Sequence, residues 1–349
     1  MKALPLAITL GDVAGIGPEI IVQAFRDAPR ALQGCFVVGD VAALRRAAGW
    51  VQRAGQVTLP LAVLESPMQA LSVPPRCLPV LPVTAPDPLP PPGRISAAAG
   101  RLAADCVVWA ARAALRGEIA GLVTAPLHKE ALAAAGAPFD AFPGHTELLQ
   151  AEAAAFLGRP VDALPVRMML ANDELRTVLV SIHMSLRQAI DAVTHDNVLQ
   201  TLRITHAALG VLLGRAPRIG VAGLNPHAGE GGLFGREELD TIAPAIAQAR
   251  AEGIDAQGPH APDTVFMRAR ARAGQPGEFD VVVAMYHDQG LIPVKYLGVE
   301  KGVNVTLGLP LVRTSPDHGT AFDIAGTGRA DASSLIEAVN MARRLAQRT

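Results

Sequence analysis

The chain has 349 residues, of which half are hydrophobic and 18% are charged, and its formal net charge is -1. This length can bury a large core and predicts one or two domains. No basic face stands out, which argues against nucleic acid as a partner. No stretch approaches the ~20 consecutive apolar residues of a membrane helix, and the amino terminus lacks the pattern of a signal peptide. We therefore expect a cytoplasmic protein without membrane contacts.

Short apolar runs alternate with helical patterns along the chain. The predicted strands cover residues 4–10, 35–38, 121–123, 166–171, 175–181, 219–223 and 281–285. The predicted helices cover residues 18–26, 42–48, 96–116, 141–156, 194–213, 237–251 and 333–348. This alternation predicts an α/β fold with a mostly parallel sheet. Asn172 and Asp173 separate two strands directly, so a hairpin and a mixed sheet are expected in the middle of the chain.

Three histidines each come shortly after the end of a predicted strand: His183, His227 and His287. The carboxyl ends of parallel strands meet at one edge of a sheet, where ligands bind. Imidazole is a common metal ligand, and three of them with an open position suit a catalytic divalent cation. Asp288 could orient His287 or serve as a fourth ligand. The sequence thus predicts a metal site, with three unrelated structural histidines as the alternative.

Two glycine-rich segments are candidates for ligand contacts. Residues 225–232 (NPHAGEGG) follow a strand, and their backbone could approach a ligand closely, so we expect Asn225 and Gly229 to bind cofactor. The alternative is a long turn that needs positive φ angles. Residues 11–17 (GDVAGIG) do not match the dinucleotide pattern GxGxxG, but they precede a helix whose amino terminus favours an anion or a polar group.

Several polar side chains lie in apolar surroundings, where they need partners. His145 and Thr146 stand near a helix start, which suits a phosphate or carboxylate, although Thr146 could equally be a helix cap. Lys295 and Arg313 are flanked by apolar residues, and arginine there suits bidentate recognition of an anion. Asp323 could accept both hydroxyls of an adenine ribose and would repel a 2'-phosphate, so NAD is favoured over NADP unless Asp323 only caps a helix.

Taken together, these motifs resemble the 4-hydroxythreonine-4-phosphate dehydrogenase family of vitamin B6 biosynthesis. The matching segments are residues 11–19, 124–129, 144–147, 181–187, 223–238, 262–264 and 284–331. They span nearly the whole chain in the family's order. The pattern at residues 318–326 is also shared with isocitrate and isopropylmalate dehydrogenases. One departure is Val13, where the family usually has proline, and it leaves room for a paralogue with another substrate.

The resemblance implies a fold of two α/β/α domains around a cleft, similar to isocitrate and isopropylmalate dehydrogenases. We expect residues 1–140 with 305–349 to form the nucleotide-side domain, and residues 141–304 to form the domain for metal, substrate and dimerisation. Family members are homodimers whose active site is completed across the interface. One metal ligand, by our expectation His287, would then come from the second subunit.

The resemblance also implies an activity: NAD-dependent oxidation of 4-phosphohydroxy-L-threonine, followed by decarboxylation to 3-amino-2-oxopropyl phosphate, in pyridoxal 5'-phosphate biosynthesis. The implied metal ligands are His183, His227 and His287. The implied substrate contacts are His145, Thr146, Lys295, Asn304 and Arg313. A divalent cation would acidify the substrate hydroxyl and stabilise an enolate. Asp263 or Lys295 is expected to move the hydroxyl proton, and zinc, magnesium, cobalt or manganese could be the metal.

Other functions stay open at this point. A paralogous dehydrogenase of 4-phosphoerythronate or 4-phosphothreonate would need the same phosphate contacts. A dehydrogenase of an aromatic cis-dihydrodiol carboxylate would not need them. A metal-dependent hydrolase could use the three histidines with a bound water, and a phosphate-binding protein would need no catalysis. Neither of these last two requires a carboxylate for a ribose diol, so Asp323 favours a dehydrogenase.

Overall fold

The computed structural model describes residues 3–52, 57–86, 88–272 and 274–347. The chain divides into two compact units, which we call unit 1 (Met1–Pro165 with Leu309–Gln347) and unit 2 (Val166–Gly308). The sequence predicted domain boundaries after residues 140 and 304. In the structure the chain passes from one unit to the other after residues 165 and 308, so residues 141–165 belong to unit 1. The roles assigned to the two domains, and the cleft between them, stay predictions.

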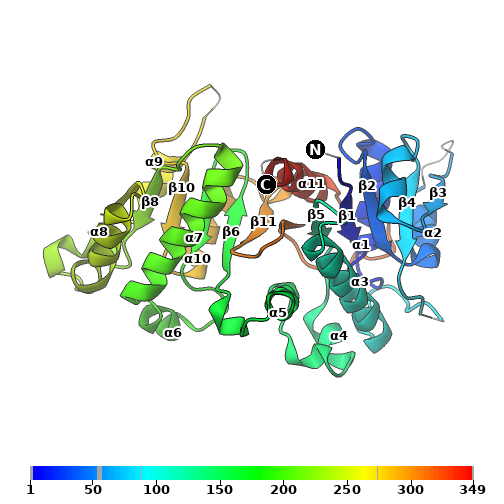
Figure 1. The fold of residues 1–349 in the computed structure, drawn as a ribbon, viewed down its shortest axis with the longest axis horizontal. Helices are drawn as coiled ribbons and strands as arrows, with labels where there is room; N and C mark the ends of the chain where they lie inside the picture. Colours follow the sequence, from blue (N-terminus) through cyan, green and yellow to red (C-terminus); the bar gives the residue numbers. More distant parts are fainter. Residues whose placement is uncertain (1–2, 53–56, 87, 273, 348–349) are drawn as a thin grey trace. The chain divides into compact units, whose positions relative to one another are not determined.

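Unit 1 combines a sheet with helices from both ends of the chain (Figure 1). Its strands are β1 (Leu6–Thr9), β2 (Cys35–Gly39), β3 (Leu61–Val63), β4 (Leu78–Pro82), β5 (Gly121–Thr124) and β12 (Arg313–Pro316). Its α-helices are α1 (Gly17–Asp27), α2 (Val41–Trp50), α3 (Ala97–Leu115), α4 (Lys129–Ala134), α5 (His145–Leu157) and α11 (Ser333–Ala346). Short 3-10 turns are η1 (Pro67–Ser72), η2 (Phe139–Ala141) and η3 (Val161–Ala163).

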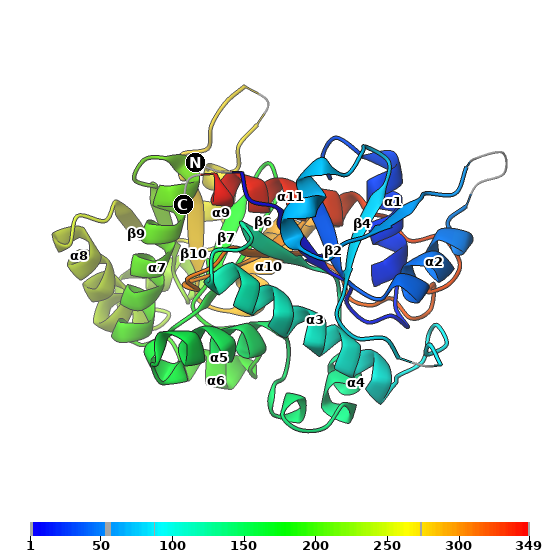
Figure 2. The ribbon, with the colours of Figure 1, turned by 45° about the vertical axis from the view of Figure 1, so that its right-hand side comes forward.

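The sheet of unit 1 has the strand order β3-β4-β2-β1-β5-β12, and these neighbours pair in parallel. Ile8 pairs with Val37 on one side and Val123 on the other, and all three are fully buried. Helix α3 packs on β1, β2 and β5, while α11 packs on β5 and β12 (Figure 2). Helices therefore shield the apolar central strands, as in other parallel sheets.

Unit 2 contains the middle of the chain. Its strands are β6 (Arg167–Ala171), β7 (Arg176–Leu179), β8 (Ile219–Ala222), β9 (Ala256–His260), β10 (Val281–Ala284) and β11 (Val303–Leu307). Its α-helices are α6 (Leu186–Asp191), α7 (His195–Leu213), α8 (Ala243–Ala251), α9 (Val265–Ala269) and α10 (His287–Tyr296). Shorter turns are η4 (Pro226–Gly232), the π-helical η5 (Glu238–Ile242) and η6 (Val299–Lys301).

The sheet of unit 2 is mixed, with the order β11-β6-β7-β10-β8-β9. Strands β7, β10, β8 and β9 run parallel, whereas β6 is antiparallel to both β7 and β11. Between β6 and β7, the Asn172 side chain accepts hydrogen bonds from the Glu174 and Leu175 N–H groups and donates to the Val294 carbonyl. This confirms the predicted α/β class and the predicted hairpin in a mixed sheet.

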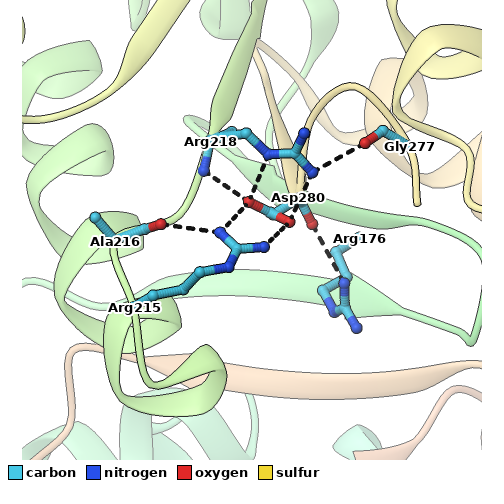
Figure 3. Close-up of polar contacts among 6 residues, drawn as sticks. All are labelled: Arg176, Arg215, Ala216, Arg218, Gly277 and Asp280. Carbon is cyan, nitrogen blue, oxygen red and sulfur yellow. Dashed lines mark hydrogen bonds and ion pairs between the residues drawn. The ribbon is translucent and has the colours of Figure 1, made fainter.

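Asp280 fixes the amino edge of the unit 2 sheet, just before β10 begins (Figure 3). Its carboxylate accepts hydrogen bonds from the Arg215 guanidinium at 2.7 and 2.8 Å and from the Arg218 backbone N–H at 2.8 Å. Burial alone would raise the pKa of Asp280, but the hydrogen bonds and charges of Arg215 and Arg218 hold that pKa below its usual range. The carboxylate therefore ties the segment before β8 to the start of β10.

Some elements differ from the prediction. The helix expected over 141–156 begins at His145, and the helix expected over 237–251 starts with the π-helical turn η5. Short elements were not predicted, among them β9, β11, β12, α4, α6, α9 and α10. Within the described ranges, none of the helices has the length and apolar character needed to cross a membrane.

Candidate active site

The three histidines predicted as metal ligands follow the ends of three neighbouring parallel strands of unit 2. In the order β7-β10-β8, Val283 of β10 pairs with Val178 of β7 and with Val221 of β8. The carboxyl ends of the three strands therefore meet at one edge. His183, His227 and His287 all follow these ends, as the sequence predicted. Whether they bind a metal stays a prediction.

His183 and His287 lie together at this edge. Their ring centres are 5.8 Å apart. Two imidazoles on one tetrahedral cation have ring centres about 5 Å apart, given metal–nitrogen bonds of ~2.0–2.1 Å. His287 Nδ1 lies 2.7 Å from an Asp288 carboxylate oxygen, an arrangement that often orients a metal-binding histidine and directs its Nε2 to the cation. The two residues fit a divalent metal.

An open cavity of about 630 Å³ lies beside this pair. Its lining comes from the segment after β7 and the start of α10, and it is Ile182, His183, Met184, Ser185, Leu186, Gln188, Ala189, Tyr286, His287 and Asp288. The size is within the range of small-molecule sites. Unit 2 by itself thus offers space for a ligand next to both imidazoles.

His227 has a different setting. Residues 227–231 all have positive φ angles and form a left-handed turn within η4. Glu238 holds the start of this turn: its Oε1 accepts from the Leu224 and Asn225 N–H groups, both at 2.7 Å. The Asn225 amide donates to Glu237 and Glu238 at 2.7 and 2.9 Å. The alternative interpretation of this segment, a long turn with positive φ angles, is confirmed, and the expected cofactor contacts of Asn225 and Gly229 stay predictions.

Gly229 is the buried centre of the same turn, with φ of 80°. A Cβ atom there would lie 2.7 Å from Glu238 Oε2 and 3.0 Å from the Gly235 carbonyl oxygen. Only glycine fits this position without movement. The His227 ring is exposed and lies 6.2 Å from the Phe234 ring. Among the described residues of one chain, no three His, Cys, Asp or Glu side chains converge as a metal site.

The remaining predicted residues of unit 2 lie on separate elements. Lys295 is exposed on α10, Asn304 is half-buried on β11, and Asp263 is exposed just before α9. Lys295 and His287 lie on the same helix, α10, which begins at His287. The expected roles of Asp263 and Lys295 in proton transfer stay predictions.

Arg313 belongs to unit 1 and is buried, with 4% of its surface exposed. Its Nε and Nη2 groups donate to the Thr124 hydroxyl at 3.2 and 2.8 Å, which ties β12 to the end of β5. Burial lowers the pKa of Arg313 to about 10, and the nearby Glu147 carboxylate partly opposes this. The planar guanidinium of arginine matches the geometry of phosphate and carboxylate groups, so an anionic ligand suits this position.

His145 and Thr146 open helix α5, in unit 1 as well. Burial and the charge of Arg313 hold the pKa of His145 well below its ordinary value. The imidazole is therefore neutral at pH 7. Its Nε2 is buried and has no hydrogen-bond partner within the ranges that the structure describes. Neutral His145 beside cationic Arg313 could donate or accept a hydrogen bond at a bound anion.

Asp323 is exposed in the loop between β12 and α11. Glu19 of α1 fixes this loop, because its carboxylate accepts from the Gly326 and Gly328 N–H groups at 2.5 and 2.7 Å. The Ile16 N–H also donates to the Thr320 carbonyl at 3.0 Å. The glycine-rich segment 11–17 therefore packs against the loop of Asp323 and leaves its carboxylate accessible.

Sequence reasoning did not single out Asp12 and His128 of unit 1. Asp12 is fully buried, and burial raises the pKa of its carboxyl to about 6, although the Ala14 N–H donates to Oδ1 at 2.8 Å and opposes this. The His128 ring stacks on Phe322 at 4.7 Å between ring centres. Asp12 Oδ2 and His128 Nδ1 have no partner in the part of the chain described. The only sequence signal for this pair was Asp12 itself, the acidic residue within the glycine-rich segment 11–17.

Comparison with known proteins identifies the family. Residues 31–342 match the profile described as pyridoxal phosphate biosynthetic protein PdxA. A 4-hydroxythreonine-4-phosphate dehydrogenase of Beijerinckia indica is 53% identical over 98% of this chain and 95% of its own length. A D-threonate 4-phosphate dehydrogenase of Salmonella typhimurium is 44% identical over 99% of this chain and 100% of its own.

A solved 4-hydroxythreonine-4-phosphate dehydrogenase of Klebsiella pneumoniae has the same fold, with a TM-score of 0.85, 41% identity and 99% of each chain covered. The similarity extends over both units and includes the strands that carry the histidines. These relatives are all named dehydrogenases. The chain therefore belongs to the PdxA family of pyridoxal phosphate biosynthetic proteins and is a dehydrogenase.

Proposed function

We propose that this dehydrogenase oxidises 4-phosphohydroxy-L-threonine with NAD and releases 3-amino-2-oxopropyl phosphate after decarboxylation, as a step toward pyridoxal 5'-phosphate. The observation that carries the proposal is the 53% identity to the Beijerinckia indica enzyme over 98% of the chain. The reaction fits a cytoplasmic enzyme. Hydride leaves the carbinol carbon for the cofactor, the hydroxyl proton goes to a base, and the resulting β-keto acid loses carbon dioxide.

A divalent cation would be held by His183, His227 and His287. Bound there, it would acidify the substrate hydroxyl and stabilise the enolate that follows decarboxylation. The position of all three histidines after the carboxyl ends of neighbouring parallel strands, and the support of His287 by Asp288, favour this assignment. A homodimer would complete the ligand set, with one ligand, by our expectation His287, coming from the second subunit. Zinc is our first choice, with cobalt, manganese and magnesium as alternatives.

Recognition of the phosphate and carboxylate would fall to Arg313, His145 and Thr146 in unit 1, with Lys295 and Asn304 in unit 2. Arg313 is buried and cationic, and His145 is neutral, so together they offer charge and hydrogen bonds without mutual repulsion. Asp323 would accept the hydroxyls of the NAD ribose, with Asn225 and Gly229 as further cofactor contacts. Asp263 or Lys295 would take the hydroxyl proton.

The second candidate substrate is 4-phosphothreonate. The Salmonella typhimurium relative, named a D-threonate 4-phosphate dehydrogenase, is 44% identical over 99% of this chain and favours it. The two substrates share the phosphate, the carboxylate and the hydroxyl to be oxidised. They differ at carbon 2, where one has an ammonium group and the other a hydroxyl. Contacts to that carbon therefore decide specificity. Erythronate phosphates and cis-dihydrodiols are less favoured, the latter because they lack the phosphate.

The test measures NADH formation by the purified enzyme with 4-phosphohydroxy-L-threonine, 4-phosphothreonate and 4-phosphoerythronate, each with and without a chelator. We expect the highest kcat/KM with 4-phosphohydroxy-L-threonine, activity with NAD well above that with NADP, and loss of turnover after chelation. A higher kcat/KM with 4-phosphothreonate would transfer the assignment to the second candidate. Full activity in the chelated enzyme would refute the metal.

A further inference from the structure

Helix α1 holds the end of the loop between β12 and α11 through two side chains. Glu19 lies in the first turn of α1 and is fully buried. Its carboxylate accepts hydrogen bonds from the Gly326 and Gly328 N–H groups at 2.5 and 2.7 Å. Gln23 follows four positions later, on the same face of the helix, and its Nε2 donates to the Gly328 carbonyl at 3.3 Å. One helix face therefore binds two successive glycines of the loop.

The start of the same loop is tied to the glycine-rich segment before α1. The Ile16 N–H donates to the Thr320 carbonyl oxygen at 3.0 Å. A Cβ atom on Gly15 would lie 2.8 Å from the Thr320 Cβ, so glycine is needed for this close approach. The next residue, Ala321, has a φ of 42°, which a residue with a side chain seldom adopts. Such strain persists only where surrounding contacts hold the backbone.

Asp323 lies between these two points of attachment, three positions after Thr320 and three before Gly326. Its side chain is exposed, although the loop is held on both sides of it. A ligand that reaches Asp323 therefore meets a backbone that is already fixed. Binding then costs less entropy, because the ligand does not have to order the loop. Loss of an attachment should weaken such a ligand without removing any group that contacts it.

We propose that Glu19 is a positioning residue for the cofactor, because it holds the loop from which Asp323 would accept the hydroxyls of the NAD ribose. This rests on the proposed role of Asp323. The glycine-rich segment and the start of α1 then serve as the seat of this loop and not as an anion site, in keeping with the burial of all of residues 11–19. The competing interpretation is that Glu19 only stabilises the packing of α1.

Glu19→Gln and Asp323→Ala together separate the two interpretations. Glutamine keeps the shape of the side chain and one acceptor oxygen, but its NH2 group cannot accept from the second glycine N–H. If Glu19 acts through Asp323, the protein with both substitutions binds NAD no more weakly than Asp323→Ala alone. If Glu19 contributes only to packing, any loss that its substitution causes adds to the loss from Asp323→Ala.

Two further variants complete the set. Gln23→Met removes only the bond to the Gly328 carbonyl, and it replaces Glu19→Gln in the same comparison with Asp323→Ala if Glu19→Gln does not fold. Asp280→Asn is the matched control. The Asp280 carboxylate is also largely shielded from water, with 9% of its side chain exposed, and accepts from a backbone N–H, but it lies at the amino edge of the unit 2 sheet.

The experiment measures the dissociation constant of NAD for each full-length protein by titration calorimetry, and the unfolding temperature of the same samples. We expect Glu19→Gln and Asp323→Ala each to bind NAD about 10-fold more weakly, the effect of one lost hydrogen bond to a charged group. Gln23→Met, which loses a bond between neutral groups, should bind about threefold more weakly. In Glu19→Gln the KM for NAD should rise while kcat stays within about threefold. Asp280→Asn should unfold at a lower temperature and bind NAD within about twofold of the original.

Three results would contradict the positioning role. Unchanged NAD affinity in Glu19→Gln and Gln23→Met would show that α1 does not position the cofactor. A loss of about 100-fold in the protein with both Glu19→Gln and Asp323→Ala would show that Glu19 acts independently of Asp323. An equal loss in Asp280→Asn would trace the effect to general stability. Unchanged affinity in Asp323→Ala alone would instead refute the proposed ribose contact, and the positioning role with it.

Discussion

The carboxyl edges of the two sheets hold their functional side chains in different ways. In unit 2, His183 and His287 line an open cavity of about 630 Å³, and hydrogen bonds to the backbone before them fix their positions. In unit 1, Arg313 and Asp12 are buried, and burial itself shifts their pKa values. Unit 2 thus presents two imidazoles at an open cavity, whereas unit 1 keeps ionisable groups away from water.

The largest loss of activity should come from a substitution at the carboxyl edge of the unit 2 sheet. His287→Ala should lower kcat about 1,000-fold or more and reduce metal content, because a bound cation contributes several kcal/mol to such a reaction. His195→Ala is the control, since His195 starts α7 in the same unit and its Nδ1 lies 3.1 Å from a carboxylate oxygen of its neighbour Asp196. Steady-state kinetics and metal analysis measure both. Normal metal content in His287→Ala would remove His287 from the ligand set.

A substitution of the buried arginine in unit 1 should weaken substrate recognition. Arg313→Met should lower kcat/KM about 100-fold, since losing one partner of a buried charge contact costs about 2–5 kcal/mol. Its free energy of unfolding should fall by about 1–2 kcal/mol, because the hydrogen bonds to the Thr124 hydroxyl are lost. Arg167→Met is the control: Arg167 is also partly buried, has its pKa lowered by burial, and bonds to the Thr201 hydroxyl in unit 2. Equal losses of kcat/KM in both variants would contradict the prediction.

Asp12 should make stability fall with rising pH. Burial raises the pKa of Asp12 to about 6 in the folded protein, above about 3.9 in the unfolded chain. The folded state then binds the proton more tightly, so this stabilisation is complete below pH 4 and is lost as pH rises to about 6. The loss should be about 2–3 kcal/mol. Urea unfolding from pH 4 to 8 should show it in the original protein, and Asp12→Asn should reduce the slope by this amount and leave the part due to Glu19, whose pKa is also raised by burial.

Asp280 should give the opposite slope in a lower pH range. Its pKa is held below the usual range in the folded state, so its stabilisation is present above about pH 4 and is lost as pH falls further. Asp280→Asn should cost about 1.5 kcal/mol at pH 7, the value of a hydrogen bond to a charged group. The cost should shrink toward pH 2. Urea unfolding of both proteins at pH 7 and pH 2.5 tests this, and an unchanged cost at low pH would contradict it.

Much of the fold was predictable from the sequence, for reasons visible in particular residues. The uninterrupted runs of β1, β5, β8 and β10 have no other stable place than the centre of a parallel sheet. Helix α10 was missed because Gly290 and Pro293 interrupt its pattern. Strand β12 was missed because it contains Arg313, a residue that is seldom buried.

The site was predictable where it depends on strand ends and not where it depends on contacts distant in sequence. The histidines follow apolar runs, and parallel neighbours bring such ends together. Gln289 bonds to Gly223, 66 residues earlier, and no local pattern reports that contact. Likewise, the shifted pKa of Asp12 depends on burial that only the folded chain creates. The split of the two units at residue 165, and not at 140, depends on the packing of α5, which helical periodicity does not specify.

The return of residues 309–347 to unit 1 has a consequence for how the protein is made. Strand β12 and helix α11 complete a sheet whose other strands are synthesised more than 180 residues earlier. During synthesis the first 165 residues therefore leave the ribosome with the β5 edge uncovered, and that edge stays uncovered until β12 has been made. Chains that stop early would carry this unpaired strand permanently, and unpaired edges promote aggregation.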